Sequence, residues 1–567
     1  MSSKYYEQFN TGKILDEYPR PHLVRNSYLN LNGYYEYQIT DNKQMPSFDP
    51  KQRILVPFPP ESELSKVKRI LMPDEYLYYH RLIKIPQEFG DRTLLLHFDG
   101  IDQIADIYIN DEFVLKHEGG YLPFTIELSD ISESFDLKIR VRDYSDTSFY
   151  SRGKQKLQRG GIWYTPISGI WKNVWLECVP DNYITDYRVR LDHQNHTFTI
   201  DVDSKKPWST AYIDIHNQRY LPGVAIPLDG YELWDLERPI LHEFTIYMDD
   251  DIVKGYFLNR KIELKNDDQG HKRFYLNDRE VFIHGLLDQG YYNEGILTPI
   301  SDEMMIDDIL RAKALGFNTL RKHIKIEPLR WYYHCDHLGM LVIQDMVNGG
   351  REYNPVLISS PLFLKLPLKD KLYSLFGRQD EKGRKLYYEE LEGMVRLLSH
   401  YNSIIMWVPF NEGWGQFDSR KAYELIRKLD DERLIDHASG WYDQKIGEIL
   451  SIHCYFKKFR IPKNRDNRAI FLSEFGGYQL PIKDHCFNDK EFGYKKYTSK
   501  EELEQGITSL YHEQIIPAIA KGLMGVIYTQ LTDVEDEVNG LITYDRRVAK
   551  VRVNLFKELL KEVNGSE

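Results

Sequence analysis

The chain has 567 residues, and at roughly 150 residues per domain this length predicts three to four domains. Its 74 Lys and Arg against 86 Asp and Glu give a net charge of −12, which argues against electrostatic binding to nucleic acid or to an anionic membrane. Hydrophobic residues make up 42% of the chain, enough for several buried cores, so a globally disordered chain is excluded.

The sequence carries no targeting signal that we recognise. The N-terminal segment, MSSKYYEQFN, lacks a basic stretch followed by an apolar run, and no segment approaches 18 apolar residues. We therefore expect neither a signal peptide nor a membrane-spanning helix, and we expect a cytoplasmic protein. The four cysteines lie far apart and form no CxxC pair, so neither a disulfide framework nor a structural zinc site is predicted.

Short strands and turns fill the first 265 residues. Aliphatic runs of strand length, such as residues 94–98 and 104–110, alternate with turn signals such as Asp99-Gly100. No helix of 12 or more residues is predicted in this part. The pattern indicates two β-sandwiches, one over residues 1–180 and a smaller one of immunoglobulin size over residues 181–265.

From about residue 270 the pattern changes to alternating strands and helices. Ser301 and Gly316 are predicted to bound one helix, and Pro328 and Gly339 the next. Eight strands are predicted, at residues 281–285, 317–320, 340–344, 404–408, 434–437, 449–453, 469–473 and 524–529. Eight strands, most of them separated by a helical segment, indicate a closed (β/α)₈ barrel over residues 266–567.

Two glutamates follow hydrophobic strands of this barrel. Glu412 comes after the strand at 404–408, and Glu474 comes directly after the strand at 469–473. The carboxyl ends of barrel strands are where such enzymes carry out chemistry. Two carboxyl groups across a barrel mouth suit glycosidic cleavage, because one donates a proton to the leaving oxygen while the other attacks or activates water. A single Glu is more often solvated, so the inference rests on the pair.

Several short motifs occur along the chain in a specific order. In the first sandwich they are Leu31-Asn32-Gly33, Val56-Pro57-Phe58, Tyr79-His80-Arg81, Gly119-Gly120-Tyr121-Leu122-Pro123-Phe124 and Ser168-Gly169-Ile170-Trp171. In the barrel they are Ala314-Leu315-Gly316-Phe317-Asn318, Arg321-Lys322-His323, Asp336-His337-Leu338-Gly339, Asn411-Glu412 and Ser473-Glu474-Phe475-Gly476. Through these motifs the chain resembles glycoside hydrolase family 2, the family of β-galactosidases, β-glucuronidases and β-mannosidases, along essentially its whole length. The resemblance implies a sugar-binding jelly roll, an immunoglobulin-like β-sandwich and a (β/α)₈ TIM barrel, in agreement with the division above.

The resemblance also implies roles for four residues. Glu412 is expected to be the general acid/base and Glu474 the nucleophile of a retaining glycosidase. Asn411 matches an Asn that contacts the sugar 2-hydroxyl, and Tyr455 resembles a Tyr that hydrogen-bonds the nucleophile. Retention requires carboxyl groups about 5–5.5 Å apart. No metal and no organic cofactor is expected.

Departures from the family pattern bear on which sugar is cleaved. Trp163 stands where the best-known relatives carry an Asp that contacts the far end of the sugar, and Asp288 is a candidate substitute ligand. The stretch Glu537-Val538-Asn539-Gly540 lacks the Lys with which glucuronidases pair the substrate carboxylate. A uronide would face the acidic residues between 533 and 537, so a neutral hexoside is favoured, with β-galactoside as the default, unless Lys154 or Lys322 reaches the site.

Further binding residues are expected around the barrel mouth. Trp414 is a candidate wall for a sugar ring, and His323 and Gln530 follow strands two and eight. Arg321 is predicted to pair with a barrel carboxylate. The acidic run from Asp533 is interpreted as a solvated or sugar-binding loop, and not as a calcium site.

Three alternatives remain open at this point. One is a β-uronidase or β-mannosidase of the same family, and another is a non-catalytic carbohydrate-binding protein on the same fold. The third is transglycosylation, in which a sugar hydroxyl replaces water. The expected partner is a carbohydrate substrate, and a homo-oligomer is compatible with the exposed sandwich surfaces. The aglycone, the linkage and the oligomeric state do not follow from the sequence.

Overall fold

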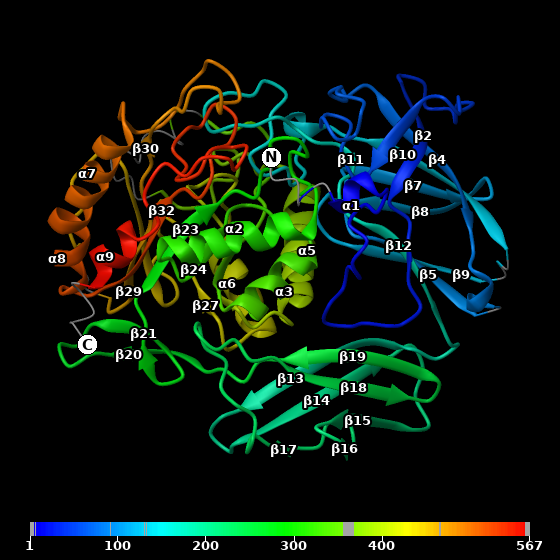
Figure 1. Ribbon diagram of the computed structural model, residues 1–567, viewed down its shortest axis with the longest axis horizontal. Coiled ribbons are helices and arrows are strands. Elements are labelled where there is room, and N and C mark those ends of the chain that lie inside the picture. The colour runs from blue at the N-terminus through cyan, green and yellow to red at the C-terminus, as the bar shows by residue number, and fades with distance from the viewer. Residues whose placement is uncertain are drawn as a thin grey trace.

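The computed structural model describes residue 5 and residues 7–561, apart from 91, 130, 132, 355, 357–367, 464 and 465. It contains two β-sandwiches and a barrel (Figure 1). The barrel lies on the left of the view, the first sandwich on the right, and the second sandwich below both. This arrangement confirms the predicted class of jelly roll, immunoglobulin-like sandwich and TIM barrel.

The first sandwich consists mainly of two antiparallel sheets, with strand orders β1-β12-β5-β9 and β3-β2-β4-β10-β7-β8. Its strands are β1 Leu29–Asn30, β2 Gly33–Thr40, β3 Arg53–Val56, β4 Tyr76–Lys84, β5 Thr93–Phe98, β6 Ile101–Asp102, β7 Ile104–Ile109, β8 Glu112–Glu118, β9 Phe124–Leu128, β10 Ser134–Arg142, β11 Gly169–Ile170 and β12 Val174–Val179. Burial alternates along β10, where Leu137, Ile139 and Val141 point into the core. This period of two places one face of each strand in the core, as expected for a sandwich.

The second sandwich pairs the sheet β13-β14-β17 with the sheet β16-β15-β18-β19. Its strands are β13 Ile184–Asp192, β14 Thr197–Ser204, β15 Ala211–Ile215, β16 Gln218–Tyr220, β17 Ile226–Pro227, β18 His242–Met248 and β19 Asp251–Phe257. Apolar residues from both sheets, among them Ile200, Ile213 and Ile246, form a separate core. The predicted boundary at residue 180 falls between β12 and β13, whereas the one at residue 265 falls within the next strand, β20 Ile262–Asn266, and both remain predictions.

The barrel is an eight-stranded parallel sheet with the order β27-β26-β25-β24-β23-β32-β29-β28. Its strands are β23 Ile283–Asp288, β24 Thr319–Lys322, β25 Leu341–Asp345, β26 Ile404–Val408, β27 Leu434–Ile435, β28 Ile449–Cys454, β29 Ala469–Gly476 and β32 Leu523–Thr529. Each coincides with a predicted strand, give or take a few residues. Neighbouring strands pair throughout this order, so only the gap between β27 and β28 separates the described sheet from full closure.

Helices cover the outside of the barrel. They are α2 Asp302–Leu315, α3 Leu329–Leu338, α5 Glu381–Leu398, α6 Ser419–Leu429, α7 Lys500–Leu510, α8 Ile516–Ile519 and α9 Leu555–Lys561, with a π-helical turn, η5, at Tyr511–Ile515. Ser301 and Gly316 bound α2 as predicted, and Gly316 adopts a left-handed φ of 102°. The sequence predicted that α3 begins at Pro328. In the structure Pro328 is the N-cap, and the helix begins one residue later, at Leu329. Shorter elements elsewhere are α1 Glu7–Asn10, η2 Gln87–Phe89 and η3 Ser145–Thr147.

The barrel interior is sealed at one end by a small antiparallel sheet. This sheet contains β20 Ile262–Asn266, β21 Lys272–Leu276 and β22 Arg279–Glu280. Phe274 and Leu276 of β21 belong to the same buried cluster as Ile283 and Phe471 from inside the barrel. The remaining pair is β30 Tyr478–Gln479 with β31 Lys495–Lys496. Among the residues described, no helix combines the length and the apolar character needed to cross a membrane.

A buried arginine joins the two sandwiches. Arg25, which precedes β1, donates to Glu177 of β12 at 2.9 Å and to Asp251 of β19 at 2.8 and 3.0 Å. Its side chain is 4% exposed, and the two carboxylates are 0% and 4% exposed. Glu177 also pairs with Arg20 at 2.8 Å, so Asp251 is the carboxylate that depends on Arg25 for a cation, and an unpaired buried charge is costly.

We expect Arg25→Met to lower the free energy of unfolding by about 3–5 kcal/mol, because it leaves carboxylates of two domains without their shared cation. Urea unfolding followed by circular dichroism measures the change. The control is Arg190→Met, which removes a pair with Asp201 whose side chains are 64% and 40% exposed, so its effect should stay at about 0–1 kcal/mol. Equal effects of the two substitutions would contradict the role given to Arg25.

Candidate active site

Glu412 lies in the loop that follows β26, in an unusual backbone conformation. Its φ is +51°, in the left-handed region that non-glycine residues rarely adopt. Its N–H donates to the carbonyl of Ser439 at 3.0 Å, and Asn411 forms a bridge with the same residue. Such a conformation persists only where its surroundings hold it, and it is frequent at functional sites.

Glu474 belongs to β29 itself. The strand continues to Gly476, so this glutamate is not past the strand end as the sequence suggested. Its residue is 4% exposed, against 7% for Glu412. Both carboxyl groups are thus held in the interior at the carboxyl-terminal end of the barrel strands.

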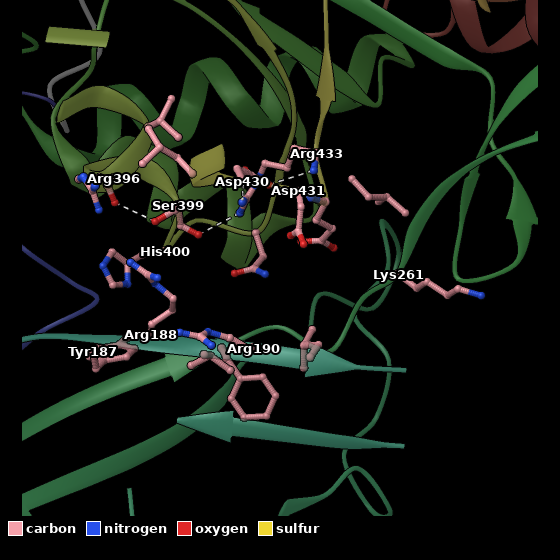
Figure 2. Close-up of a pocket in the computed structure, with 18 of the residues that line it drawn as sticks. Tyr187, Arg188, Arg190, Lys261, Arg396, Ser399, His400, Asp430, Asp431 and Arg433 are labelled. Atoms are coloured by element: carbon pink, nitrogen blue, oxygen red, sulfur yellow. Dashed lines mark hydrogen bonds and ion pairs between the residues drawn. The ribbon is translucent and has the colours of Figure 1, made fainter. Parts of the chain in front are cut away.

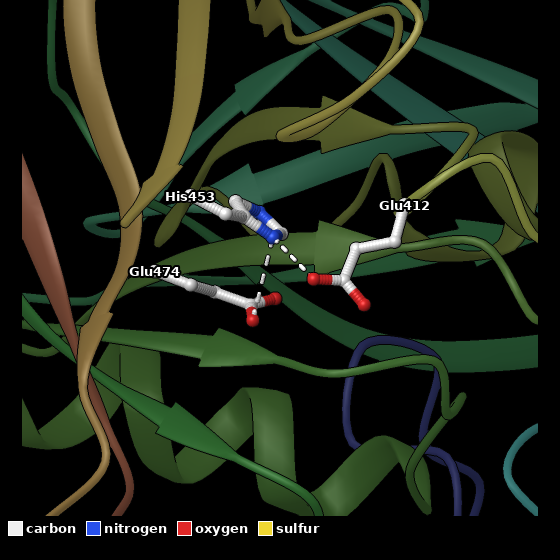
Figure 3. A group of neighbouring side chains, drawn as sticks. All are labelled: Glu412, His453 and Glu474. Atoms are coloured by element: carbon white, nitrogen blue, oxygen red, sulfur yellow. Dashed lines mark hydrogen bonds and ion pairs between the residues drawn. The ribbon is translucent and has the colours of Figure 1, made fainter. Parts of the chain in front are cut away.

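His453, in β28, bridges the two carboxylates (Figure 3). Its Nδ1 lies 2.8 Å from Glu412 Oε1 and 3.5 Å from Glu474 Oε2. Its Nε2 lies 3.1 Å from the hydroxyl of Ser439. One side-chain atom from each of the three residues lies within 4.8 Å of the other two, so an oxygen of Glu412 and one of Glu474 are no farther apart than this. Imidazole and carboxylate are also metal ligands, but the hydrogen bonds of His453 already account for the grouping.

Arg321, in β24, contacts Glu474 and two residues beside it. Its guanidinium donates to both oxygens of Asp345 at 3.0 Å, to Glu474 Oε1 at 3.2 Å and to Asn411 Oδ1 at 2.8 Å. The predicted pairing of Arg321 with a barrel carboxylate is therefore confirmed. Because the Asn411 oxygen accepts from Arg321, its Nδ2 is left buried and without a hydrogen-bond partner among the described residues.

Tyr455 completes the surroundings of Glu474. Its hydroxyl donates to Glu474 Oε2 at 2.5 Å and lies 2.8 Å from the hydroxyl of Thr529. The ring stacks on Tyr494 with centroids 3.8 Å apart, which fixes its orientation. Glu474 thus receives hydrogen bonds from both Arg321 and Tyr455.

The two glutamates have opposite pKa shifts. Burial, and next the negative charge of Glu474, raise the pKa of Glu412 above its usual 4.5. Burial also acts to raise the pKa of Glu474, but the charges of His453 and Arg321 and the hydrogen bond from Tyr455 outweigh it, so the pKa falls below 4.5. Glu474 is therefore ionised under conditions where Glu412 retains its proton.

The predicted binding residues Trp163, Trp414 and His323 lie together. The rings of Trp163 and Trp414 are 5.2 Å apart, and the ring of His323 is 6.5 Å from that of Trp414. His323 Nδ1 lies 2.8 Å from Asp345. Burial, followed by the positive charge of Lys154, lowers the pKa of His323 well below 6.5, so this imidazole is neutral.

Gln530 and Asp288 differ in whether all their side-chain polar atoms have hydrogen-bond partners. Gln530 donates to Asn539 at 2.6 Å, while its own side-chain oxygen is buried without a partner among the described residues. Asp288 accepts from Lys322 at 2.6 Å and from the N–H of Gly290 at 2.9 Å. With both oxygens occupied, Asp288 offers a poor ligand for a sugar hydroxyl, and its predicted role remains untested.

Another cavity lies away from the glutamates. It measures about 780 Å³ and opens between β13 and the loops that join α5 to β26 and α6 to β27 (Figure 2). Arg188, Arg190, Asp430 and Arg433 are among its lining residues. These loops precede their strands, so this cavity is at the opposite end of the barrel from the glutamates.

Two family models match this chain. The TIM barrel domain of glycosyl hydrolases family 2 matches residues 268–548, and the galactose-binding domain-like part of glycosyl hydrolase 2 matches residues 57–166. The chain belongs to glycoside hydrolase family 2. The two matched segments include both glutamates and the greater part of the first sandwich.

Relatives within the family carry different names. A β-galactosidase of Thermoanaerobacter pseudethanolicus is 21% identical over 72% of this chain and 55% of its own length. A β-glucuronidase of Streptococcus agalactiae is 21% identical over 88% of this chain and 91% of its own length. The chain spans about half or less of the length of the first β-galactosidases it matches.

Solved structures agree on the fold. The β-D-glucuronidase of Dictyoglomus thermophilum superposes with a TM-score of 0.73 at 17% identity and covers 96% of this chain and 98% of its own. A family 2 β-galacturonidase from Eisenbergiella tayi gives 0.71 at 16% identity, over 95% of this chain and 98% of its own. At such low identity the likeness establishes the fold alone.

We expect the two carboxyl groups to titrate on opposite sides of pH 4.5. ¹³C NMR of enzyme labelled at the glutamate δ carbons measures this, with assignment by loss of each signal in Glu412→Gln and Glu474→Gln. In Glu474→Gln the pKa of Glu412 should fall, because the charge that helped to raise it is gone. Glu389→Gln, which removes a 58% exposed side chain, should leave both titrations unchanged. A Glu412 that titrates below Glu474 would refute the assignment.

Proposed function

We propose that this chain is a retaining, exo-acting β-glycosidase that hydrolyses a terminal β-linked sugar through a covalent glycosyl-enzyme intermediate. The observation that carries the proposal is the pair of buried carboxyl groups with opposite pKa shifts and oxygens within 4.8 Å of each other. Retaining glycosidases hold their two carboxyl groups about 5–5.5 Å apart, whereas inverting ones need about 6.5–9.5 Å to admit a water molecule.

In this mechanism the two glutamates have separate tasks. Glu474, kept ionised by Arg321 and Tyr455, attacks the anomeric carbon, and Glu412 gives its proton to the departing oxygen. The glycosyl ester to Glu474 forms as the glycosidic bond breaks. Glu412, now ionised, takes a proton from water, which attacks the anomeric carbon and frees the sugar with its configuration retained.

Unused polar atoms near the glutamates support a sugar ligand. Asn411 Nδ2, Trp414 Nε1 and Gln530 Oε1 are buried and lack partners among the described residues. Buried polar atoms are nearly always hydrogen-bonded, so such atoms suit the hydroxyl groups of a bound ligand. The opposite pKa shifts favour catalysis over a purely sugar-binding role, since binding alone needs no division between acid and base.

The glycone is the less determined part of the proposal. The sequence favoured a neutral hexoside such as β-galactoside, on the argument that acidic residues 533–537 would repel a uronide. Those carboxylates are occupied, however. Asp533 pairs with Lys550 at 2.6 Å, Asp536 with Arg159 at 2.9 Å, and Glu535 accepts the N–H of Thr165 at 3.0 Å.

The fourth carboxylate, Glu537, accepts hydrogen bonds from Tyr164 and Asn539. The repulsion argument therefore loses most of its force. The names of relatives, which include β-galactosidase, β-glucuronidase and β-galacturonidase, are compatible with either a neutral or an anionic glycone.

The direct test is hydrolysis of p-nitrophenyl β-galactoside, glucoside, mannoside, glucuronide and galacturonide, with NMR detection of the first anomer released. We expect the β-anomer first. Glu474→Gln should lower kcat by on the order of 10⁴-fold or more, and Glu412→Gln by about 10²–10⁴-fold. Added azide should restore turnover only in the Glu412 variant, because azide needs no general base.

The control for these variants is Glu389→Gln on the exposed side of α5, which should retain full activity. First release of the α-anomer would exclude retention. Full activity of Glu474→Gln would exclude the proposed nucleophile. Transfer of the sugar to an added alcohol in place of water would assign the same residues to transglycosylation.

We further expect Tyr455→Phe to move the acid limb of the kcat/KM profile to higher pH. The Tyr455 hydroxyl lowers the pKa of Glu474 by hydrogen-bonding its ionised form, so its loss raises that pKa and the nucleophile becomes protonated at a higher pH. Tyr497→Phe is the matched control, since the Tyr497 hydroxyl is buried without a hydrogen-bond partner in the described chain. An unchanged acid limb in Tyr455→Phe would argue against this role.

A further inference from the structure

A loop of the first sandwich reaches the barrel mouth. The N–H groups of Arg152 and Gly153 donate to the carbonyl of Asn348 at 2.9 and 3.1 Å, and Ser151 forms a bridge with Gly349. These contacts join the segment between β10 and β11 to the loop after β25. Lys154, the next residue along, is thereby held at a fixed position beside the active site.

Lys154 is buried but has no oxygen partner. It is 6% exposed, and its ammonium makes no hydrogen bond or ion pair with any described residue. The other buried lysines all have one: Lys172 to the Tyr121 carbonyl at 2.9 Å, Lys322 to Asp288 at 2.6 Å, Lys325 to the Gly290 carbonyl at 2.6 Å and Lys550 to Asp533 at 2.6 Å. A buried cation without a partner is costly, so proteins rarely keep one without a use.

Lys154 lies in the same surroundings as Glu412 and Glu474. Its ammonium lies 5.7 Å from the ring centroid of Trp414 and 5.3 Å from that of Tyr164, two aromatic faces that favour a cation. Its charge also acts on Glu412 and His323, since it lowers the pKa of both. Lys154 therefore brings a positive charge to the pocket in which the two glutamates lie.

Neither glutamate neutralises this charge. Glu474 receives its hydrogen bonds from Arg321 and Tyr455, and Glu412 lies against His453. The ammonium of Lys154 is therefore available to a ligand. We propose that Lys154 binds the carboxylate of a hexuronic acid, and that the enzyme's glycone is a β-linked uronic acid. This inference rests on the proposed glycosidase function and adds the substrate class.

A single carboxylate is the anion that fits best. One ammonium between two aromatic rings balances one negative charge, whereas a phosphate dianion calls for several donors or a second cation. The C6 carboxylate of a hexuronic acid is attached at C5, on the other side of the ring oxygen from the anomeric carbon, and it points away from the ring. It can therefore meet a cation contributed by another domain while the anomeric carbon meets Glu474.

The test compares p-nitrophenyl β-glucuronide and β-galacturonide with the corresponding neutral glucoside and galactoside. We expect kcat/KM for one of the uronides to exceed that of its neutral counterpart by on the order of 100-fold. Lys154→Met should remove most of this preference, chiefly through KM. Lys154→Arg should retain part of it. On the neutral sugars, measured at the pH optimum of each variant because loss of Lys154 also raises the pKa of Glu412, kcat/KM should change far less than on the uronides, since the neutral sugars offer no charge to pair.

Two controls separate this role from a structural one. Lys382→Met removes a lysine that is 60% exposed and should leave the preference intact. Lys154→Met should not lower the thermal midpoint of unfolding, since it replaces an unpaired buried charge with an apolar side chain. A lower midpoint together with equal losses on both classes of sugar would overturn the proposal.

Binding provides a readout that does not depend on turnover. Calorimetry with uronic isofagomine and isofagomine, which shares its ring amine but lacks the carboxylate, should give about 100-fold tighter binding of the uronic compound by the unmodified enzyme, and similar affinities in Lys154→Met. Equal affinities in the unmodified enzyme would overturn the uronide proposal, even if no glycoside in the panel is cleaved. Hydrolysis of neutral sugars alone would overturn it too, while the retaining mechanism would stand.

Discussion

The active site depends on one buried cation, Arg321. Its guanidinium simultaneously contacts Asp345 on β25, Glu474 on β29 and Asn411 after β26, and it also donates to the carbonyl of Ser473 at 3.0 Å. A planar guanidinium can satisfy several acceptors in fixed directions, which an ammonium cannot do. Three barrel strands are therefore held in register around the group that sets the charge of Glu474.

The division between the two glutamates follows from this arrangement. Both are buried, so burial alone would raise both pKa values. Only Glu474 receives the hydrogen bonds of Arg321 and Tyr455, while Glu412 faces the resulting negative charge. The asymmetry comes from the donors around each carboxylate, and not from a difference in burial. His453 lies between them and contacts both.

The architecture could be predicted from the sequence because local residue patterns determine where its strands lie and where its helices end. Most barrel strands are rich in hydrophobic residues, although β24 reads Thr-Leu-Arg-Lys, and Gly316 and Gly339 end their helices in left-handed conformations. The glutamate pair could be predicted because both residues lie near strand ends. Leu310 lies at helical spacing from Ile306 in α2, yet it is 44% exposed, because burial on that helix centres on Met305 and Ile309. Helical spacing alone does not define the width of the buried face.

Contacts between distant segments could not be predicted in the same way. The contacts of His453 with both glutamates do not follow from the sequence, since a histidine near a strand end has no local mark that distinguishes a structural role from a catalytic one. The partners of the acidic run, such as Lys550 with Asp533 and Arg159 with Asp536, are fixed only by the folded chain. The number of acidic residues in this segment of the sequence therefore overstated the negative electrostatic potential at the candidate active site.

Because the loop at 151–155 reaches the barrel, two domains together form the pocket. Glu412 and Glu474 stand on the barrel, whereas the wall that carries Lys154 and Trp163 is supplied by the first sandwich and attached through the backbone at Asn348. The pocket is complete only after these two independently cored domains have docked. Substitutions in the first sandwich can therefore change the side chains that line the pocket while Glu412 and Glu474 stay the same. The same barrel can in this way be adapted to new substrates through changes in the neighbouring domain.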